Sequence, residues 1–216
     1  ASMIAGIRNG GGDKIIFATD SMVVAAYLPI SMLTYYAIGG SLIEYFRSMT
    51  TSLATVVNPV ASSLEAGNDS TALKGVLLGG TKASVAIGLP VCIGFIMLGE
   101  TFINLWMGPS YGAQAGAVLA VLAVGHLVNL PYYTISGILY GLGQHRHIAI
   151  YRILEGAVNL GLSITLVQSH GLVGVALGTA VPQMVVAAAL LPRMLATLLP
   201  FSLPDYYRWT YLRPFV

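Results

Sequence analysis

The residues that could do chemistry are ionisable side chains inside long apolar stretches. Glu44 and Arg47 lie three positions apart in a run that begins near Ile30, and Arg152 and Glu155 repeat this spacing in a later run. A spacing of three residues puts both side chains on one helix face, where they can pair. Ionisable residues within a membrane are costly and are enriched at substrate and ion sites. Each pair is therefore either part of a binding site or a self-neutralising pair near a membrane face, and Arg152 has the further alternative of a topology anchor.

Three more polar residues lie within apolar runs. Asp20 interrupts the first run, and is either a proton or sodium site or a cap at the end of an incomplete span. His126 and Asn129 share a helix face close to Pro131. They either line a cavity, where they would bind substrate, or form a hydrogen-bonded pair beside a proline kink.

Other kinds of site find no support in the sequence. His145 and His147 lie in one turn and His170 in another on the opposite side, so these histidines do not converge on a metal. The glycines at 10–12 do not follow a strand, and there is no nucleophile elbow, so we expect no cofactor and no enzyme activity. A net charge of +2 is too small to indicate a nucleic-acid partner.

The composition explains what must position these residues. The chain has 216 residues, of which 56% are hydrophobic and 8% charged, with a mean hydropathy of +0.79. Soluble domains carry roughly 25% charged residues. Continuous apolar runs favour helices over a barrel, whose signal is alternation. We predict an all-α integral membrane bundle with about six spans, at 15–28, 30–57, 76–98, 113–142, 148–167 and 172–191.

The segments between the spans are predicted as follows. The stretch from Gly99 to Tyr111 separates two apolar runs and is interpreted as a short loop, with Gly108-Pro109 ending a helix. Residues 61–75 form the clearest polar loop, in which Asp69 or Ser70 caps the next helix. Residues 1–199 form the bundle, and 200–216 form a cytoplasmic interfacial tail rich in aromatic and basic residues.

The distribution of basic residues predicts the orientation. When six spans alternate, the segments 25–33, 99–112 and 168–171 share one side, and these three contain no Lys or Arg. The opposite side receives Arg8, Lys14, Lys74, Lys82, Arg146, Arg152, Arg193, Arg208 and Arg213. By the positive-inside rule this basic side is cytoplasmic, so we expect both ends of the chain in the cytoplasm.

Several short motifs occur in an order that is informative as a set. They are Thr19-Asp20 with Tyr35-Tyr36, Pro59 with Ser62 and Leu64-Glu65-Ala66, Gly67-Asn68-Asp69, Leu105-Trp106-Met107-Gly108, Gly137 to Gly143, Glu155 with Asn159, and Gly171-Leu172-Val173-Gly174. From about Thr19 to Thr179 this order resembles the C-terminal half of oligosaccharide flippases of the Wzx or O-antigen translocase type. That superfamily also holds MurJ-like lipid II flippases and MATE drug exporters.

The resemblance implies one lobe of a transporter with 12 to 14 helices, in which two six-helix lobes enclose a central cavity that opens alternately to each side of the inner membrane. The implied substrate is a polyprenyl-diphosphate-linked oligosaccharide, such as an O-antigen unit of lipopolysaccharide. The implied partners are membrane lipid, the missing N-terminal lobe, and the polysaccharide polymerase and chain-length machinery. The chain departs from the family pattern at the glycines 10–12, where the family has the apolar start of a span.

The resemblance also implies roles for the polar residues. Arg47 would face the cavity and meet phosphate, Glu44 would hold or release it, and Asp20 would couple transport to an ion gradient. Two rival functions remain open: a cation-coupled multidrug exporter of the MATE type, and a non-transporting membrane subunit or polymerase-like glycan enzyme. An enzyme of that kind should carry clustered polar residues in a large outward loop, and the outward loops here are short.

Overall fold

The protein is an all-α bundle. The computed structural model describes residues 12–67, 69–199 and 201–212, and in these ranges it contains helices and no strand. The elements are α2 (Gly12–Tyr27), α3 (Ser31–Ala66), α4 (Ser70–Met107), α5 (Gly112–Gly141), α6 (His145–Val185), the π-helix η2 (Val186–Leu190), α7 (Leu191–Leu198), α8 (Leu203–Tyr207) and the π-helix η3 (Arg208–Leu212). This confirms the predicted fold class.

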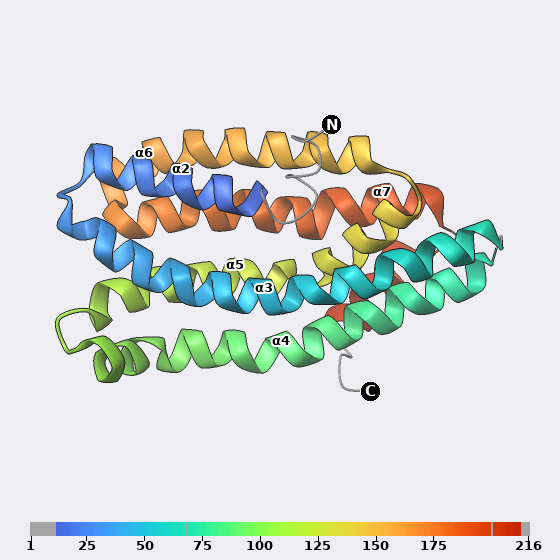
Figure 1. Cartoon of the computed structure of the whole chain (residues 1–216), viewed down its shortest axis with the longest axis horizontal. Coiled ribbons are helices and arrows are strands. Elements are labelled where there is room, and N and C mark those ends of the chain that lie inside the picture. The colour runs from blue at the N-terminus through green and yellow to red at the C-terminus, as the bar shows by residue number, and fades with distance from the viewer. Residues whose placement is uncertain (1–11, 68, 200, 213–216) are drawn as a thin grey trace.

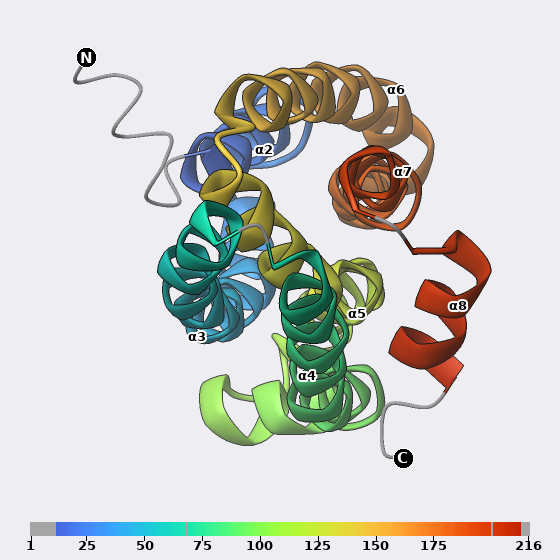
Figure 2. The ribbon, with the colours of Figure 1, turned by 90° about the vertical axis from the view of Figure 1, so that its right-hand side faces the viewer.

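The long helices lie side by side in an elongated bundle (Figure 1). Seen end-on, α5 occupies the middle, with α3 and α4 on one side and α6 on the other (Figure 2). Residues 129–139 of α5 are buried without interruption, which agrees with a helix that packs against neighbours on every side.

The helix labelled α6 is a hairpin of two arms, residues 145–170 and 172–185. Gly171 has φ 57° and ψ −133° and breaks the helical geometry between them. A side chain at Gly174 would collide with the Leu166 carbonyl, and one at Gly178 with Ser163, so small residues let the arms pack closely. The predicted turn at 168–171 is thereby confirmed.

The described residues include three helices that are long and apolar enough to cross a membrane: Ser70–Met107, Gly112–Gly141 and His145–Leu198. The last of these contains the α6 hairpin and therefore supplies two of the predicted spans. The fold is a membrane helical bundle. The spans predicted at 15–28 and 30–57 correspond to α2 and α3, and their crossing of the membrane stays a prediction.

Two predicted boundaries were wrong. Helix α3 continues past the predicted span end at residue 57 to Ala66, and α4 begins at Ser70, so only residues 67–69 of the polar loop predicted at 61–75 lie outside these helices. Likewise α4 continues to Met107, and the loop predicted at 99–111 shrinks to residues 108–111. Polar residues indicate where a chain leaves the hydrocarbon core of the membrane, but they do not end a helix. A helix can continue into the polar region because its backbone hydrogen bonds are internal.

Two predicted helix ends were right. The Asp69 carboxylate accepts a hydrogen bond of 2.9 Å from the Ala72 amide, which caps α4. Gly108 has φ 110°, a conformation that favours glycine, and α4 ends there. Arg8, the glycines at 10 and 11 and Arg213 lie outside the described residues, whereas Gly12 and Lys14 belong to α2.

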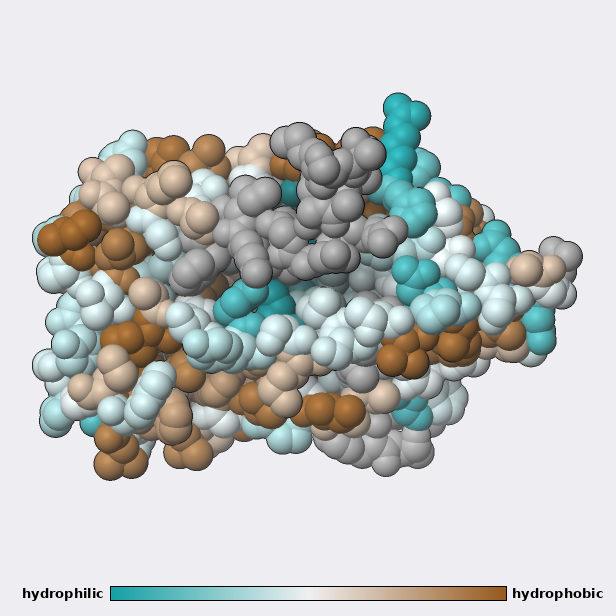
Figure 3. Space-filling view, viewed as in Figure 1, coloured by the Kyte–Doolittle hydropathy of each residue, from teal (hydrophilic) through white to brown (hydrophobic). Residues whose placement is uncertain are grey.

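The two ends of the bundle differ in charge. The turns after α2 and after α4 and the turn at Gly171 share one end, and these are the segments that lack Lys and Arg (Figure 1). The turn between α5 and α6, beside Arg146, lies at the other end, where strongly hydrophilic residues gather (Figure 3). The structure therefore places at one end of the bundle the three segments that alternating spans predicted to share one side of the membrane. Which end faces the cytoplasm stays a prediction.

Residues 203–212 pack against the bundle rather than extending away from it. Tyr206 is buried and belongs to the hydrophobic cluster that also contains residues of α5, η2 and α7. The Tyr207 hydroxyl donates to the Ala188 carbonyl, and the Tyr211 hydroxyl donates to the Val128 carbonyl at 2.8 Å. Trp209 lies beneath the Lys82 ammonium, which is 5.3 Å from the ring centre. The boundary predicted at residue 200 stays a prediction.

Candidate functional site

Side chains from four elements meet around a small cavity inside the bundle. It is lined by Asp20 of α2, Tyr36, Gly40, Ile43, Glu44 and Arg47 of α3, Leu122 of α5 and Thr179 of the second α6 arm. Its volume of about 10 Å³ suits about one water molecule. We call this set the central polar site. Tyr36, Gly40, Ile43 and Arg47 fall at steps of four, three and four residues along α3, and so lie on one helix face, with Glu44 at its edge.

Asp20 is the most buried carboxylate of the central polar site, with 1% of its surface exposed. Its Oδ2 accepts hydrogen bonds from the Tyr36 hydroxyl at 2.8 Å and the Thr179 hydroxyl at 2.6 Å. Asn159 Nδ2 in turn donates to Thr179 Oγ1 at 2.9 Å. A buried carboxylate needs such partners because desolvation is costly. Asp20 lies in the middle of α2, so it is not a helix-end cap.

Arg47 and Glu44 form the predicted pair on α3, with a distance of 3.5 Å between Arg47 Nη1 and Glu44 Oε2. The two side chains differ in exposure, at 8% for arginine and 31% for glutamate. Arg47 therefore presents a cation to the interior, while Glu44 lies at the open edge of the central polar site. Such a group can bind an anion if its carboxylate partner yields.

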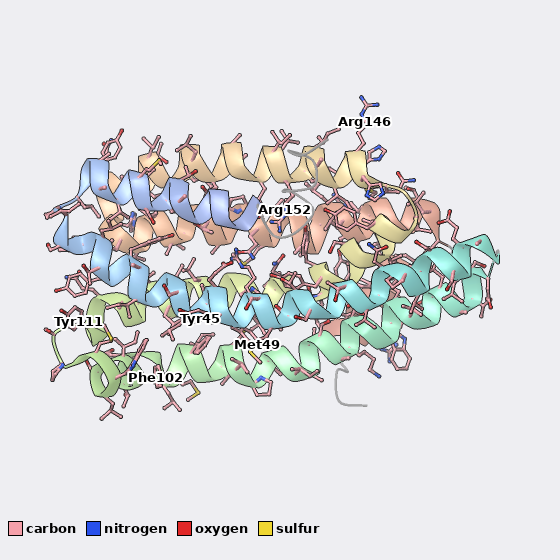
Figure 4. The ribbon with its side chains drawn as sticks, in the orientation of Figure 1. Tyr45, Met49, Phe102, Tyr111, Arg146 and Arg152 are labelled. Carbon is pink, nitrogen blue, oxygen red and sulfur yellow. The ribbon has the colours of Figure 1, made fainter. Side chains whose placement is uncertain are left out.

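Arg152 and Glu155 also pair, on the first arm of α6. Arg152 Nη1 donates to both Glu155 oxygens at 3.1 Å, and its guanidinium lies 4.6 Å from the centre of the Tyr132 ring. Glu155 is buried. Figure 4 shows Arg146, by contrast, pointing away from the bundle. Arg146 thus has the exposed placement expected of a topology anchor.

His126 and Asn129 are both buried in α5. His126 Nε2 lies 3.5 Å from the Thr50 hydroxyl, and Thr50 donates to the Arg47 carbonyl. The His126 ring also packs against Phe46. Asn129 Nδ2 makes no hydrogen bond within the part of the chain that the structure describes. His126 of α5 therefore contacts α3 at Thr50, which lies one helical turn beyond Arg47.

The structure joins some predicted residues and separates others. Asp20, Glu44 and Arg47 line one cavity although α2 and α3 supply them separately. Glu155 lies on the helix face that leads, one turn on, to Asn159 and the Asp20 network. No group of three or more potential metal ligands occurs among the described residues. The site can thus offer a guanidinium to an anion and a carboxylate to a cation.

Three members of the Asp20 network were not predicted as site residues. Tyr36 and Asn159 belonged to the resembling motifs, and Asn159 follows Glu155 by four residues, so their positions carried a signal. Thr179 carried none, because its contact with Asp20 spans 159 positions and depends on how α2 packs on α6.

Comparison with known proteins agrees with the membrane fold. Residues 12–116, just under half of the chain, match the family model described as "Polysaccharide biosynthesis protein". The chain is similar to polysaccharide biosynthesis proteins. No solved structure gives a significant match.

Two curated relatives extend the similarity beyond the matched segment. The "Uncharacterized membrane protein EpsK" of Bacillus subtilis (strain 168) is 30% identical over 141 residues, which is 62% of this chain and 27% of EpsK. The "Probable low-salt glycan biosynthesis flippase Agl15" of Haloferax volcanii is 21% identical over 161 residues, which is 74% of this chain and 34% of Agl15. The matched region spans between about a quarter and a third of the length of these relatives. Together with the helices that can cross a membrane, they support a multi-pass membrane protein.

Proposed function

We propose that this chain is one lobe of a flippase for a polyprenyl-diphosphate-linked oligosaccharide, such as an O-antigen or other polysaccharide repeat unit. The observation that carries the proposal is the pair of opposite charges, Arg47 and Asp20, on one cavity inside a membrane bundle. The similarity to polysaccharide biosynthesis proteins, and to Agl15, which is named as a probable glycan biosynthesis flippase, supports a glycan as substrate. Transport requires no bond to be made or broken.

The physical problem of such a transporter explains the residues. A sugar and a diphosphate must cross hydrocarbon, and a charge buried there without partners is prohibitive. Arg47 meets the diphosphate, and Glu44, the more exposed partner, neutralises Arg47 when no substrate is bound. Arg152 with Glu155, and His126 with Asn129, contribute further polar contacts along the path. Asp20, held by hydroxyl groups, binds the coupling cation or proton.

A cavity of about 10 Å³ represents a closed arrangement, since a sugar needs far more room. In this proposal a second lobe supplies the opposite wall, and alternating access opens the cavity to each side of the inner membrane in turn. The lobes separate, the substrate enters, and the polyprenyl tail stays in lipid. The polymerase and chain-length machinery of polysaccharide synthesis would then receive the glycan at the outer face.

The test is leaflet translocation of a fluorescent polyprenyl-diphosphate oligosaccharide in proteoliposomes. It compares the chain alone with the chain joined to a complete first lobe, the joined form also carrying Arg47→Gln, Asp20→Asn or the control Arg146→Gln. We expect translocation by the joined form, a loss of at least tenfold with Arg47→Gln, loss of ion dependence with Asp20→Asn, and no change with Arg146→Gln. Export of organic cations by a folded joined form that moves no lipid-linked sugar would replace this proposal with the multidrug exporter.

A further inference from the structure

A second, larger hollow lies on the outside of α3, toward the end of the bundle that lacks Lys and Arg. It is a groove of about 560 Å³, lined by Ile30, Leu33, Thr34, Ala37, Ile38, Ser41, Tyr45 and Trp106. Tyr45 is 68% exposed and Trp106 is 57% exposed, so both rings are accessible. With the hydroxyls of Thr34 and Ser41, the phenol and the indole N–H, four hydrogen-bonding groups face one hollow beside two aromatic rings.

Another groove on the described part of the bundle surface, of similar size, has a different chemistry. It has about 520 Å³ and lies on α4, where its lining residues are Leu89, Pro90, Ile93, Gly94, Met97 and Leu98. Every one of these side chains is apolar, which suits contact with acyl chains. Two grooves of similar size thus differ in polarity, and lipid contact does not explain the hydroxyl groups of the α3 groove.

The exposed surface further along α3 is mixed. Ser48, Ser52 and Thr55 lie beside the exposed Met49 and Val56. The three hydroxyls donate to carbonyls of α3 itself, so they do not mark a polar neighbour. The contrast with α4 therefore depends on the residues of the groove.

We propose that the α3 groove is a glycan subsite, in which the oligosaccharide stacks on Tyr45 and Trp106 and hydrogen-bonds to Thr34 and Ser41. Ligand sites combine apolar and aromatic walls with a few placed polar groups, and a sugar ring presents both C–H faces and hydroxyls. This subsite rests on the proposed function, because it names the part of the lipid-linked oligosaccharide that the groove would hold.

The groove and the central polar site share no lining residue, but both are lined largely by α3, where Ser41 of the groove lies close in sequence to Glu44 of the site. Ser41 and Glu44 are three residues apart on one helix face, and Glu44 pairs with Arg47. A diphosphate held at Arg47 therefore leaves its first sugars within reach of Ser41 and Tyr45. The glycan then extends along α3 towards Trp106, at the end of the bundle that we predict faces outward.

The test measures equilibrium binding of fluorescent oligosaccharides, released by mild acid from the polyprenyl-linked glycans of the producing cells, to the purified joined form. The variants are Tyr45→Ala and Trp106→Ala. Each has a matched control close to it. For Tyr45 it is Met49→Ala, one turn further along α3 and 72% exposed (Figure 4). For Trp106 it is Leu105→Ala, at a position 84% exposed. All four positions are exposed, so folding should persist, and the melting temperature in detergent verifies it.

We expect the dissociation constant to rise at least tenfold in both aromatic variants and to stay within twofold in both controls. Unchanged glycan binding in the aromatic variants would overturn the subsite and leave Tyr45 and Trp106 as interfacial anchors. Competition by a polyprenyl diphosphate without sugar that depends on Tyr45 would also overturn it, since the groove would then hold lipid. In both cases translocation that still depends on Arg47 would leave the proposed function intact. A parent protein that neither binds nor moves the glycan would sink both proposals.

Discussion

At the scale of single residues, the two Arg–Glu pairs have the same spacing but different surroundings. Glu44 is partly exposed, whereas Glu155 is buried and receives two hydrogen bonds from Arg152. A buried carboxylate that loses its cation keeps the full cost of desolvation. The Arg152–Glu155 pair should therefore matter more for stability than the Glu44–Arg47 pair.

Replacing Arg152 with Gln should lower the free energy of unfolding by about 3 kcal/mol, because the Glu155 charge is left buried. The double replacement Arg152→Gln with Glu155→Gln should recover most of this loss, since two neutral amides remain. The control is Arg146→Gln, on the exposed face of the same helix, with an expected change within about 0.5 kcal/mol. Thermal unfolding in detergent measures all three. A double variant no more stable than Arg152→Gln would show that charge burial is not the cause.

At the scale of helices, Gly171 is the residue on which the α6 hairpin depends. Its φ of 57° with ψ of −133° is a combination that side chains with a Cβ rarely adopt. Replacing Gly171 with Ala should cost about 1–3 kcal/mol. Gly161 in the first arm is the control: it is helical with open space around it, so Gly161→Ala should stabilise by about 0.5–1 kcal/mol. Opposite signs in one thermal-unfolding series are expected, and equal signs would contradict the role of Gly171.

How much of the fold the sequence predicts depends on whether the signal is local. The Asp69 cap and the Gly108-Pro109 stop were predicted because each acts on its own helix end. The extension of α3 through Pro59 was not predicted, because the sequence beyond the apolar run is polar and its composition does not distinguish a helix from a loop. The pairs Glu44–Arg47 and Arg152–Glu155 were predicted from helical spacing. The contact between Asp20 and Thr179 was not, since it requires the packing of whole helices.

At the scale of the whole molecule, the uneven charge of the two ends predicts how the protein sits in the membrane. The native cysteine, Cys92, is buried in α4, so Cys92→Ala gives a background without thiols. In that background we expect His170→Cys to react with a membrane-impermeant maleimide added outside intact cells. Arg146→Cys should react only after the cells are opened. Both positions are exposed in the structure, so a failure to react reports sidedness. The reverse pattern would invert the predicted topology.

The packing of residues 203–212 has a consequence for biosynthesis. The Tyr211 hydroxyl donates to the Val128 carbonyl of α5, three residues before Pro131. The Tyr207 hydroxyl donates to the Ala188 carbonyl. In an α-helix that carbonyl would accept from the N–H of residue 192, which is a proline and has none. Tyr206 is buried in the hydrophobic cluster to which residues of these helices also belong. Residues 206–211, which are translated after these helices, thus complete packing between elements made earlier. The bundle can therefore reach the packing seen here only after residues 206–211 have emerged from the ribosome.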